Sequence, residues 1–284
     1  MIHIVADSTS DLSKELLDRY DITILPLHVI MDDREYLDGV NVTPEQIYEW
    51  SDRVKKTPKT SALSFEDGVN TFRKLTANGD EIIAFSISSE MSTTYNVMKL
   101  AAEELPDAGI SIIDSKNLST GIGLEVVEAA ELAKQGLSRL EIVERIEALI
   151  DKVRASFVID TLVYLYRGGR CNSLAAIFGS VLKLHPRIDV INGAMQAGQR
   201  YRGKINHVTL QYAKDMEEQL LKARPDRVFI TYSPQTDPEV VKEIHEYLES
   251  LGHFKEIFET HAGSVISSHC GPGTLGVLFI EGES

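Results

Sequence analysis

In the first half of the chain, short apolar runs alternate with longer segments of helical periodicity. The apolar runs predict strands at Ile2–Val5, Ile22–Ile30, Glu81–Phe85 and Ile110–Ile113. The segments between and after them predict helices at Leu12–Tyr20, Pro44–Lys55, Phe65–Ala77, Thr94–Glu104 and Gly123–Gln135. This alternation is typical of βαβ units, so we expect a largely parallel sheet with helices on both faces.

The second half of the chain mixes hairpin and helix signals. Ser138–Arg154 has the clearest amphipathic periodicity and predicts a helix that connects the two halves. Beyond it, the predicted strands are Ala155–Asp160, Arg187–Ile191, Met195–Arg200, Arg227–Tyr232 and Leu275–Ile280. The predicted helices are Leu174–Leu184, Leu210–Lys222 and Asp237–Leu251.

The expected fold class is α/β with two domains. Residues 1–154 would form an α/β/α N-terminal domain with a mainly parallel sheet. Residues 155–284 would form an α+β C-terminal domain with a mixed or antiparallel sheet.

The charge balance excludes some classes of partner. The chain has 284 residues and a formal net charge of −14, with 29 Lys and Arg against 43 Asp and Glu. A nucleic-acid binder needs a basic face, so none is expected here. No apolar run approaches the ~20 residues of a membrane span, and the first residues do not resemble a signal peptide, so we expect a cytoplasmic protein. Two cysteines make neither a metal-ligand spacing nor a disulfide framework, so no metal site is expected.

Hydroxyl-rich segments follow three of the predicted strands, at the points where helices begin. They cover residues 6–12, 86–95 and 114–124. Many of these side chains are ordinary helix caps, each worth ~1 kcal/mol. Strand-to-helix junctions are also where open α/β sheets bind ligands, and helix N-termini favour a carboxylate or a phosphate.

Two further polar clusters are candidates for chemistry. Thr60 and Ser61 lie between two predicted helices, where Pro58 stops regular structure. Arg167 and Arg170 flank a Gly pair, and the second of them could project into a cleft toward a carboxylate or phosphate.

Near the C-terminus, residues 267–274 form a polar turn in which Gly271 and Gly273 would present His269. A strand-entry turn whose histidine only binds backbone groups is the alternative interpretation.

Six segments of the chain resemble, in order, the signature segments of the DegV family, and the resemblance spans essentially the whole chain. The segments are Asp7–Leu12, Thr60–Ser64, Ile87–Tyr95, Asp114–Leu124, Arg167–Arg170 and His269–Gly273. The family comprises bacterial fatty-acid-binding proteins that serve as the binding subunit of fatty acid kinase. The resemblance implies two domains with a long-chain fatty acid buried between them, no catalytic residue and no other cofactor.

The resemblance also assigns site residues. Those matched to fatty-acid binding are Thr60, Ser61, Ser92, Thr93, Arg170, His269 and Gly271. Either Thr60 or Ser61 would be the closer head-group contact. Arg202 would face the phosphate or the partner, a cytosolic fatty acid kinase subunit. A role in phospholipid synthesis, with transient contact with a membrane surface, belongs to the same expectation.

The chain departs from the family pattern at two places beside the expected head-group site. It has Met91-Ser92-Thr93-Thr94-Tyr95 where the family usually has Leu-Ser-Gly-Thr-Tyr. It has Ala62-Leu63 where the family usually has Gln-Pro. Neither departure removes a proposed hydroxyl, but each could reshape the backbone near it.

Two enzyme classes are weighed against a binding protein. A serine acyl hydrolase could use Ser92 and His269 with Asp7 or Asp114, but the chain has no Gly-x-Ser-x-Gly elbow around Ser92. An enzyme that acts on a phosphorylated small molecule would need a Gly-rich phosphate loop, which is absent from the sequence. The lipid-binding function is therefore favoured.

Overall fold

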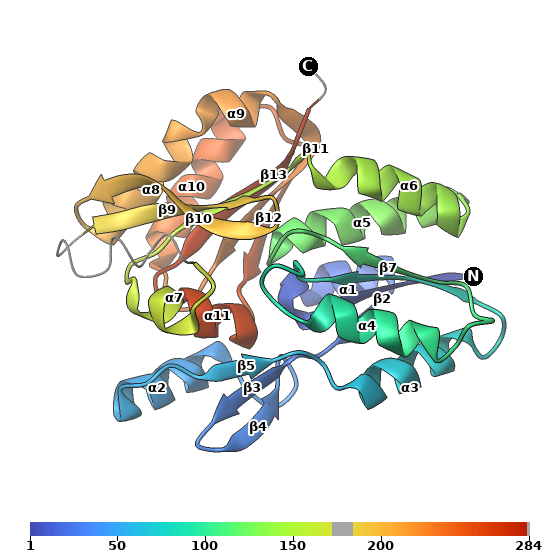
Figure 1. The fold of residues 1–284 in the computed structure, drawn as a ribbon. Helices are drawn as coiled ribbons and strands as arrows, with labels where there is room; N and C mark the ends of the chain where they lie inside the picture. Colours follow the sequence, from blue (N-terminus) through green and yellow to red (C-terminus); the bar gives the residue numbers. More distant parts are fainter. Residues whose placement is uncertain (172–183, 283–284) are drawn as a thin grey trace.

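The computed structural model describes residues 1–171 and 184–282 (Figure 1). Within these residues, the N-terminal domain is built on a four-stranded sheet in the order β2-β1-β6-β7. The strands are β1 (Ile2–Asp7), β2 (Ile22–Leu25), β6 (Glu81–Ser86) and β7 (Ile110–Asp114). All neighbouring pairs are parallel, which confirms the predicted parallel sheet.

Helices cover both faces of this sheet (Figure 1). On one face lie α3 (Phe65–Thr76) and α4 (Thr94–Glu103). On the other lie α1 (Lys14–Tyr20), α5 (Thr120–Lys134) and α6 (Arg139–Ile150). A 3₁₀ turn, η1 (Ser8–Ser10), follows β1 at the carboxyl edge of the sheet. Helix α5 is buried almost all round because it packs on β1 and also on the second domain.

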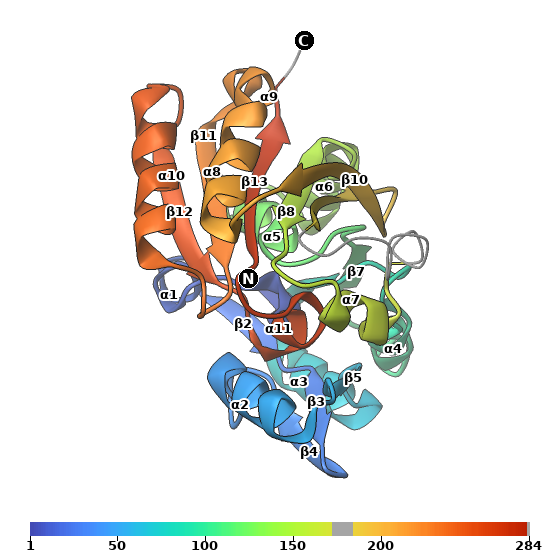
Figure 2. The ribbon, with the colours of Figure 1, turned by 90° about the vertical axis from the view of Figure 1, so that its left-hand side faces the viewer.

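The C-terminal domain contains a six-stranded mixed sheet in the order β10-β9-β8-β13-β11-β12, counted over the described residues. Its strands are β8 (Val153–Val158), β9 (Leu184–Ile191), β10 (Ala194–Arg202), β11 (Ala223–Tyr232), β12 (Glu256–His261) and β13 (Leu275–Glu281). Among the described strand pairs of this sheet, β11 with β12 is parallel and the others are antiparallel. Helices α8 (Ile205–Asp215), α9 (Glu217–Leu221) and α10 (Pro238–Ser250) complete the domain, and Figure 2 shows α8 beside α10.

A small third sheet connects the two domains. It has the order β4-β3-β5, with β3 (His28–Met31), β4 (Arg34–Leu37) and β5 (Lys59–Ser61). Helix α2 (Pro44–Val54) lies between β4 and β5 in the chain. Helix α11 (Ser264–Cys270) contacts α2, β3, β5 and α7 (Val163–Gly168). The rings of Tyr48 and Tyr164 meet edge to face, and the Tyr164 hydroxyl donates to Ser51. Segments far apart in the sequence are therefore packed together around α11.

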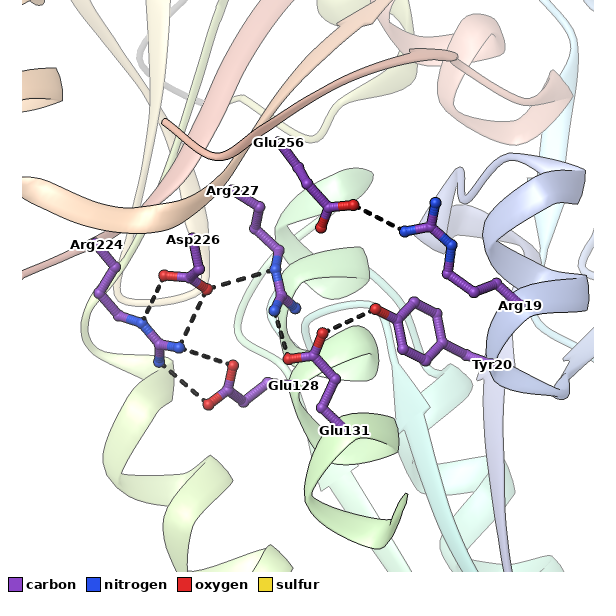
Figure 3. Close-up of polar contacts among 8 residues, drawn as sticks. All are labelled: Arg19, Tyr20, Glu128, Glu131, Arg224, Asp226, Arg227 and Glu256. Atoms are coloured by element: carbon purple, nitrogen blue, oxygen red, sulfur yellow. Dashed lines mark hydrogen bonds and ion pairs between the residues drawn. The ribbon is translucent and has the colours of Figure 1, made fainter. Parts of the chain in front are cut away.

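Ion pairs form a second contact between the domains (Figure 3). Arg224 donates to both carboxylate oxygens of Glu128 on α5, at 3.2 and 3.0 Å. Arg227, which is 4% exposed, donates to Glu131, and Glu131 also accepts from the hydroxyl of Tyr20 at 2.8 Å. These contacts join α1 and α5 to the start of β11.

The structure corrects several predicted boundaries. The expected strand Ile22–Ile30 is two strands in different sheets, because Pro26 has no N–H to continue the pairing of β2 with β1. The expected helix Ser138–Arg154 ends at Ile150, because the chain from Val153 pairs with β13 instead. The expected helix Leu210–Lys222 is two helices, which begin at Ile205 and are divided at Met216.

Other differences concern elements that the sequence analysis missed. Strands β4, β5 and β12 were not predicted. The expected helix Leu174–Leu184 lies outside the described residues except for Leu184, which begins β9. The second sheet begins at Val153, and the predicted domain boundary between residues 154 and 155 stays a prediction. In the described part of the chain, no helix is long and apolar enough to cross a membrane.

Candidate functional site

A cavity of about 470 Å³ lies where residues of both domains meet. This volume falls within the usual range of small-molecule sites. Its apolar lining among the described residues includes Leu27, Ile87, Leu118, Met195, Val265 and Ile266. Its polar lining includes Thr60, Ser61, Ser92, Thr93, Arg170 and His269. The cavity thus combines an apolar wall with a small cluster of hydrogen-bonding groups.

A larger groove of about 780 Å³ lies elsewhere, along β8 and β9. Several of its charged side chains are paired with one another, as in Arg154 with Glu281 and Arg187 with Asp189. These pairs neutralise most of the charge that could recognise a ligand, and the described lining of the groove has no cluster of hydroxyls and histidine like that of the smaller cavity. The smaller cavity is therefore the better candidate site, despite its volume.

A threonine and a histidine form the centre of the polar cluster. Strand β5 places Thr60 and α11 places His269, so that Thr60 Oγ1 lies 2.8 Å from His269 Nε2. Burial, together with the nearby positive charge of Arg170, lowers the pKa of His269 to about 4. The imidazole is therefore neutral at pH 7. Between pH 6.5 and about pH 4, the unfolded chain binds a proton at this histidine and the folded chain does not. The free energy of unfolding is therefore highest above pH 6.5 and falls as the pH drops toward 4.

The position of the imidazole proton follows from the surroundings of the two ring nitrogens. Part of the ring edge is open to the cavity, but Nδ1 is buried and has no hydrogen-bond partner in the described residues. A buried N–H without an acceptor is costly, so we assign the proton to Nε2, which donates to Thr60. The Thr60 hydroxyl then keeps its own proton for an acceptor in the cavity.

Ser92 lies across the cavity, in the turn before α4. Its Oγ accepts a hydrogen bond from the backbone N–H of Thr94 at 3.3 Å and lies 2.8 Å from Thr94 Oγ1. The side chain therefore caps α4 while it also lines the cavity. Thr93 is exposed at the cavity edge and makes no side-chain cap. The free N–H groups of this helix start add to the donors that favour an anion.

Arg170 connects the two walls of the cavity. Its Nη1 donates to the carbonyl of Gly168 at 2.7 Å, and its Nε donates to the carbonyl of Met91 at 3.4 Å. Two described backbone carbonyls therefore hold the guanidinium at the edge of the cavity. Its charge remains available to an anion.

The structure places the remaining expected residues less centrally. Ser61 is exposed and lines the cavity beside Thr60. Gly271 lies just after α11, has φ +79°, and ends that helix by donating to Ser267 at 2.9 Å. Arg202 is exposed at the end of β10 and is not among the described residues that line the cavity.

The expected presenting loop for His269 is instead the last turn of α11, which is a correction. Burial of the segment explains this, because Ser264 to Ser268 are all buried and a helix satisfies their backbone groups internally. Two buried carboxylates bind the start of this helix: Asp11 accepts from Gly263 N–H at 2.8 Å and Asp38 from Ser264 N–H at 2.7 Å. Asp38 was not among the predicted site residues, because only the folded chain brings it to α11.

A third carboxylate supports the opposite wall. Asp7 accepts from the backbone N–H of Ile87 at 2.7 Å, and Ile87 begins the serine-rich segment. Burial raises the pKa of Asp7 to about 6, although hydrogen bonds from Thr9 and Ile87 oppose the shift. Burial also raises the pKa of Asp11 and Asp38. The three carboxylates therefore hold the backbone of the segments that form the cavity walls.

The geometry disfavours the acyl hydrolase. His269 binds Thr60 rather than Ser92, and its Nδ1 contacts no carboxylate among the described residues. Asp114 binds Ser89 and Asp7 binds Ile87, so neither candidate acid orients the imidazole. Within residues 1–171 and 184–282 there is also no group of three His, Cys, Asp or Glu side chains that could hold a metal ion.

Comparison with known proteins identifies the family. The model of the DegV family, which is described as a family of uncharacterised proteins, matches residues 1–282. The chain belongs to the DegV family. A DegV domain-containing protein of Caldanaerobacter subterraneus is 31% identical over 283 residues, which cover 99% of each chain.

Solved structures of DegV proteins share the fold of this chain. A DegV family protein from Thermus thermophilus, reported for fatty acid binding, is 29% identical with a TM-score of 0.89, and the match covers 99% of each chain. A stearic acid-binding protein from Eubacterium ventriosum is 30% identical with a TM-score of 0.87, and the match covers 99% of this chain and 98% of that one. Both of these proteins, which share the fold of this chain, are described as fatty-acid-binding.

Proposed function

We propose that this DegV protein binds a long-chain fatty acid in the 470 Å³ cavity and presents the carboxylate to a partner kinase. The observation that carries the proposal is the cluster of Thr60, Ser92, Arg170 and His269 in a cavity that otherwise has an apolar wall. The acyl chain would lie along the apolar wall. The carboxylate would accept hydrogen bonds from the hydroxyls, with Arg170 supplying positive charge. The ligand is then the only cofactor-like group required.

The energetics of such a ligand divide between its two ends. Each buried methylene contributes ~0.8 kcal/mol, so a long chain contributes on the order of 10 kcal/mol before the costs of association. A buried carboxylate is costly unless several donors replace its water. Leaving a buried donor unpaired costs ~1–3 kcal/mol, so the same cluster discriminates against ligands that lack the acid. The chain supplies affinity and the head group supplies recognition.

The proposal predicts that the protein carries its ligand through purification. Extraction with organic solvent followed by mass spectrometry should find about one long-chain fatty acid per protein molecule, as expected for a single site with a large apolar contribution. The methyl ester of the same fatty acid is the control ligand, and it should bind more weakly because it presents no carboxylate. An empty protein that also fails to take up added fatty acid would contradict the proposal.

The kinase step requires a second protein. The sequence has no Gly-rich phosphate loop, so ATP would be held by a cytosolic kinase subunit that meets the carboxylate at the cavity mouth. Transfer of the γ-phosphate would produce an acyl phosphate for phospholipid synthesis. Transient contact with a membrane surface would allow the fatty acid to enter.

Arg202 is the residue proposed to face the partner, since it is exposed and lies outside the described cavity lining. We expect Arg202→Ala to leave fatty-acid affinity nearly unchanged and to reduce acyl phosphate formation with a cognate kinase sharply, because a phosphate-facing charge is lost. Initial rates at saturating fatty acid measure this. Arg200→Ala, a change at a neighbouring exposed arginine of β10, is the control. Equal rates for Arg202→Ala and the parent would remove Arg202 from the docking surface.

A further inference from the structure

Gly168 lies so close to His269 that a residue with a side chain would not fit at this position. It is the last residue of α7, and a Cβ placed on it would lie 2.3 Å from Nδ1 and 3.2 Å from Cε1 of His269. Real side-chain carbons do not approach to 2.3 Å, and imidazole Nδ1 belongs to a rigid ring. A larger residue at 168 would therefore displace the ring.

The neighbouring glycine has a different role. Gly169 has φ +67°, in the left-handed region that favours glycine, and no atom outside its chain neighbours lies within 4 Å of the position that a Cβ would take. Gly168 is not among the described residues with positive φ. Hence Gly169 is required by the backbone turn, whereas Gly168 is required by its contact with His269.

Arg170 holds Gly168 in place from the other side. The guanidinium donates to the Gly168 carbonyl at 2.7 Å, a short charge-assisted hydrogen bond. Through Nε it also donates to the carbonyl of Met91, which directly precedes Ser92. A single side chain therefore ties the backbone that abuts His269 to the backbone that carries Ser92.

We propose that Gly168 and Arg170 are positioning residues. Together they set the distance between the hydroxyls of Thr60 and Ser92 in the head-group site. Gly168 confines the imidazole so that Nε2 points to Thr60, and Arg170 fixes Gly168 relative to Ser92. This inference rests on the proposed fatty-acid function. Pre-positioned donors raise affinity because the ordering cost is met before the ligand arrives.

The test compares Gly168→Ala with Gly169→Ala, using calorimetric titration of delipidated protein with palmitate. Gly168→Ala should weaken binding by roughly 30-fold, the scale for losing one charge-assisted hydrogen bond. Gly169→Ala should change affinity less than about 3-fold. The added methyl group strains the backbone but contacts no atom of the site. In ligand-free protein, the NMR signals of the labelled His269 ring should shift in the first variant and stay unchanged in the second. Similar affinities and ring signals for the two variants would overturn the proposal.

A double-mutant cycle separates positioning from general damage. In a His269→Ala background the ring is gone, so Gly168→Ala should weaken palmitate binding no further. Equal losses in both backgrounds would overturn the proposal. If Gly168→Ala alone does not fold, the double variant should fold because the contact is relieved, and failure of both would also overturn the proposal.

Two further outcomes are distinguishable. A parent protein that is stripped of lipid and then binds neither palmitate nor another long-chain fatty acid would refute the proposed function, while the ring signals of ligand-free Gly168→Ala would still decide whether Gly168 positions His269. Arg170→Lys keeps the charge but loses the planar fork that reaches two carbonyls, so we expect it to weaken binding as well. Parent-like affinity for Arg170→Lys would exclude Arg170 from the positioning role.

Discussion

We expect Thr60→Val to weaken palmitate binding by roughly 30- to 150-fold, corresponding to a loss of ~2–3 kcal/mol. Valine preserves the shape of threonine but removes the hydroxyl. The bound carboxylate would lose one donor, and His269 Nε2, which lies 2.8 Å from Thr60 Oγ1, would lose its partner at the same time. Calorimetric titration of delipidated parent and variant with palmitate measures the difference.

Ser61→Ala is the matched control for this prediction. Ser61 is exposed and makes no described hydrogen bond to His269, so removing its hydroxyl should cost less than that of Thr60. The comparison also decides which of the two hydroxyls is the closer head-group contact. A larger loss for Ser61→Ala than for Thr60→Val would reverse the assignment of the head-group site.

The second large effect concerns stability rather than binding. We expect Arg227→Met to lower the free energy of unfolding by about 3 kcal/mol. Arg227 is 4% exposed and pairs with Glu131 and Asp226, as Figure 3 shows. Its removal leaves the partly buried Glu131 without a counter-charge, whereas Asp226 keeps Arg224. Because Glu131 lies on α5 and Arg227 on β11, the loss loosens the contact between the domains. Urea unfolding followed by circular dichroism measures it.

Arg19→Met is the matched control. The ion pair of Arg19 with Glu256 also joins the two domains, but its side chains are 38% and 41% exposed. Exposed pairs contribute only ~0.2–1 kcal/mol, so this variant should change stability little. A combined Arg227→Met and Glu131→Met variant should recover part of the lost stability, since the carboxylate that Arg227 neutralised is then removed as well. Equal losses for Arg227→Met and Arg19→Met would show that burial does not strengthen the Arg227 pair.

The fold class could be predicted because its signals are local. The alternation of apolar runs and helical segments up to Gln135 corresponds to the parallel sheet β2-β1-β6-β7 and its helices. Parallel strands end at the same edge of a sheet, so the polar segments after β1, β6 and β7 meet there. One such meeting is the hydrogen bond that Asp7, the last residue of β1, accepts from Ile87, the first residue after β6.

Boundaries failed where tertiary pairing outweighs local preference. Val153 continues a helical pattern in the sequence, yet it pairs with Ile280 in the second sheet. The segment before Gly271 has turn-like residues, yet it forms α11 because Asp11 and Asp38 bind its first N–H groups from a distant part of the chain. The residues around each boundary do not indicate these distant partners, Ile280 in the first case and Asp11 and Asp38 in the second.

Sequence alone determined which residue types stand at the strand ends, the Gly-containing turns and the tail, and therefore the family and the set of candidate head-group residues. Only the tertiary structure decided that Thr60 and His269, 209 positions apart, form one hydrogen-bonded pair, that Gly168 abuts this pair, and that Arg202 lies outside the described cavity lining. The physical reason is that periodicity and turn chemistry act over a few residues. The distance between two side chains depends on how α11 packs against α2, β5 and α7.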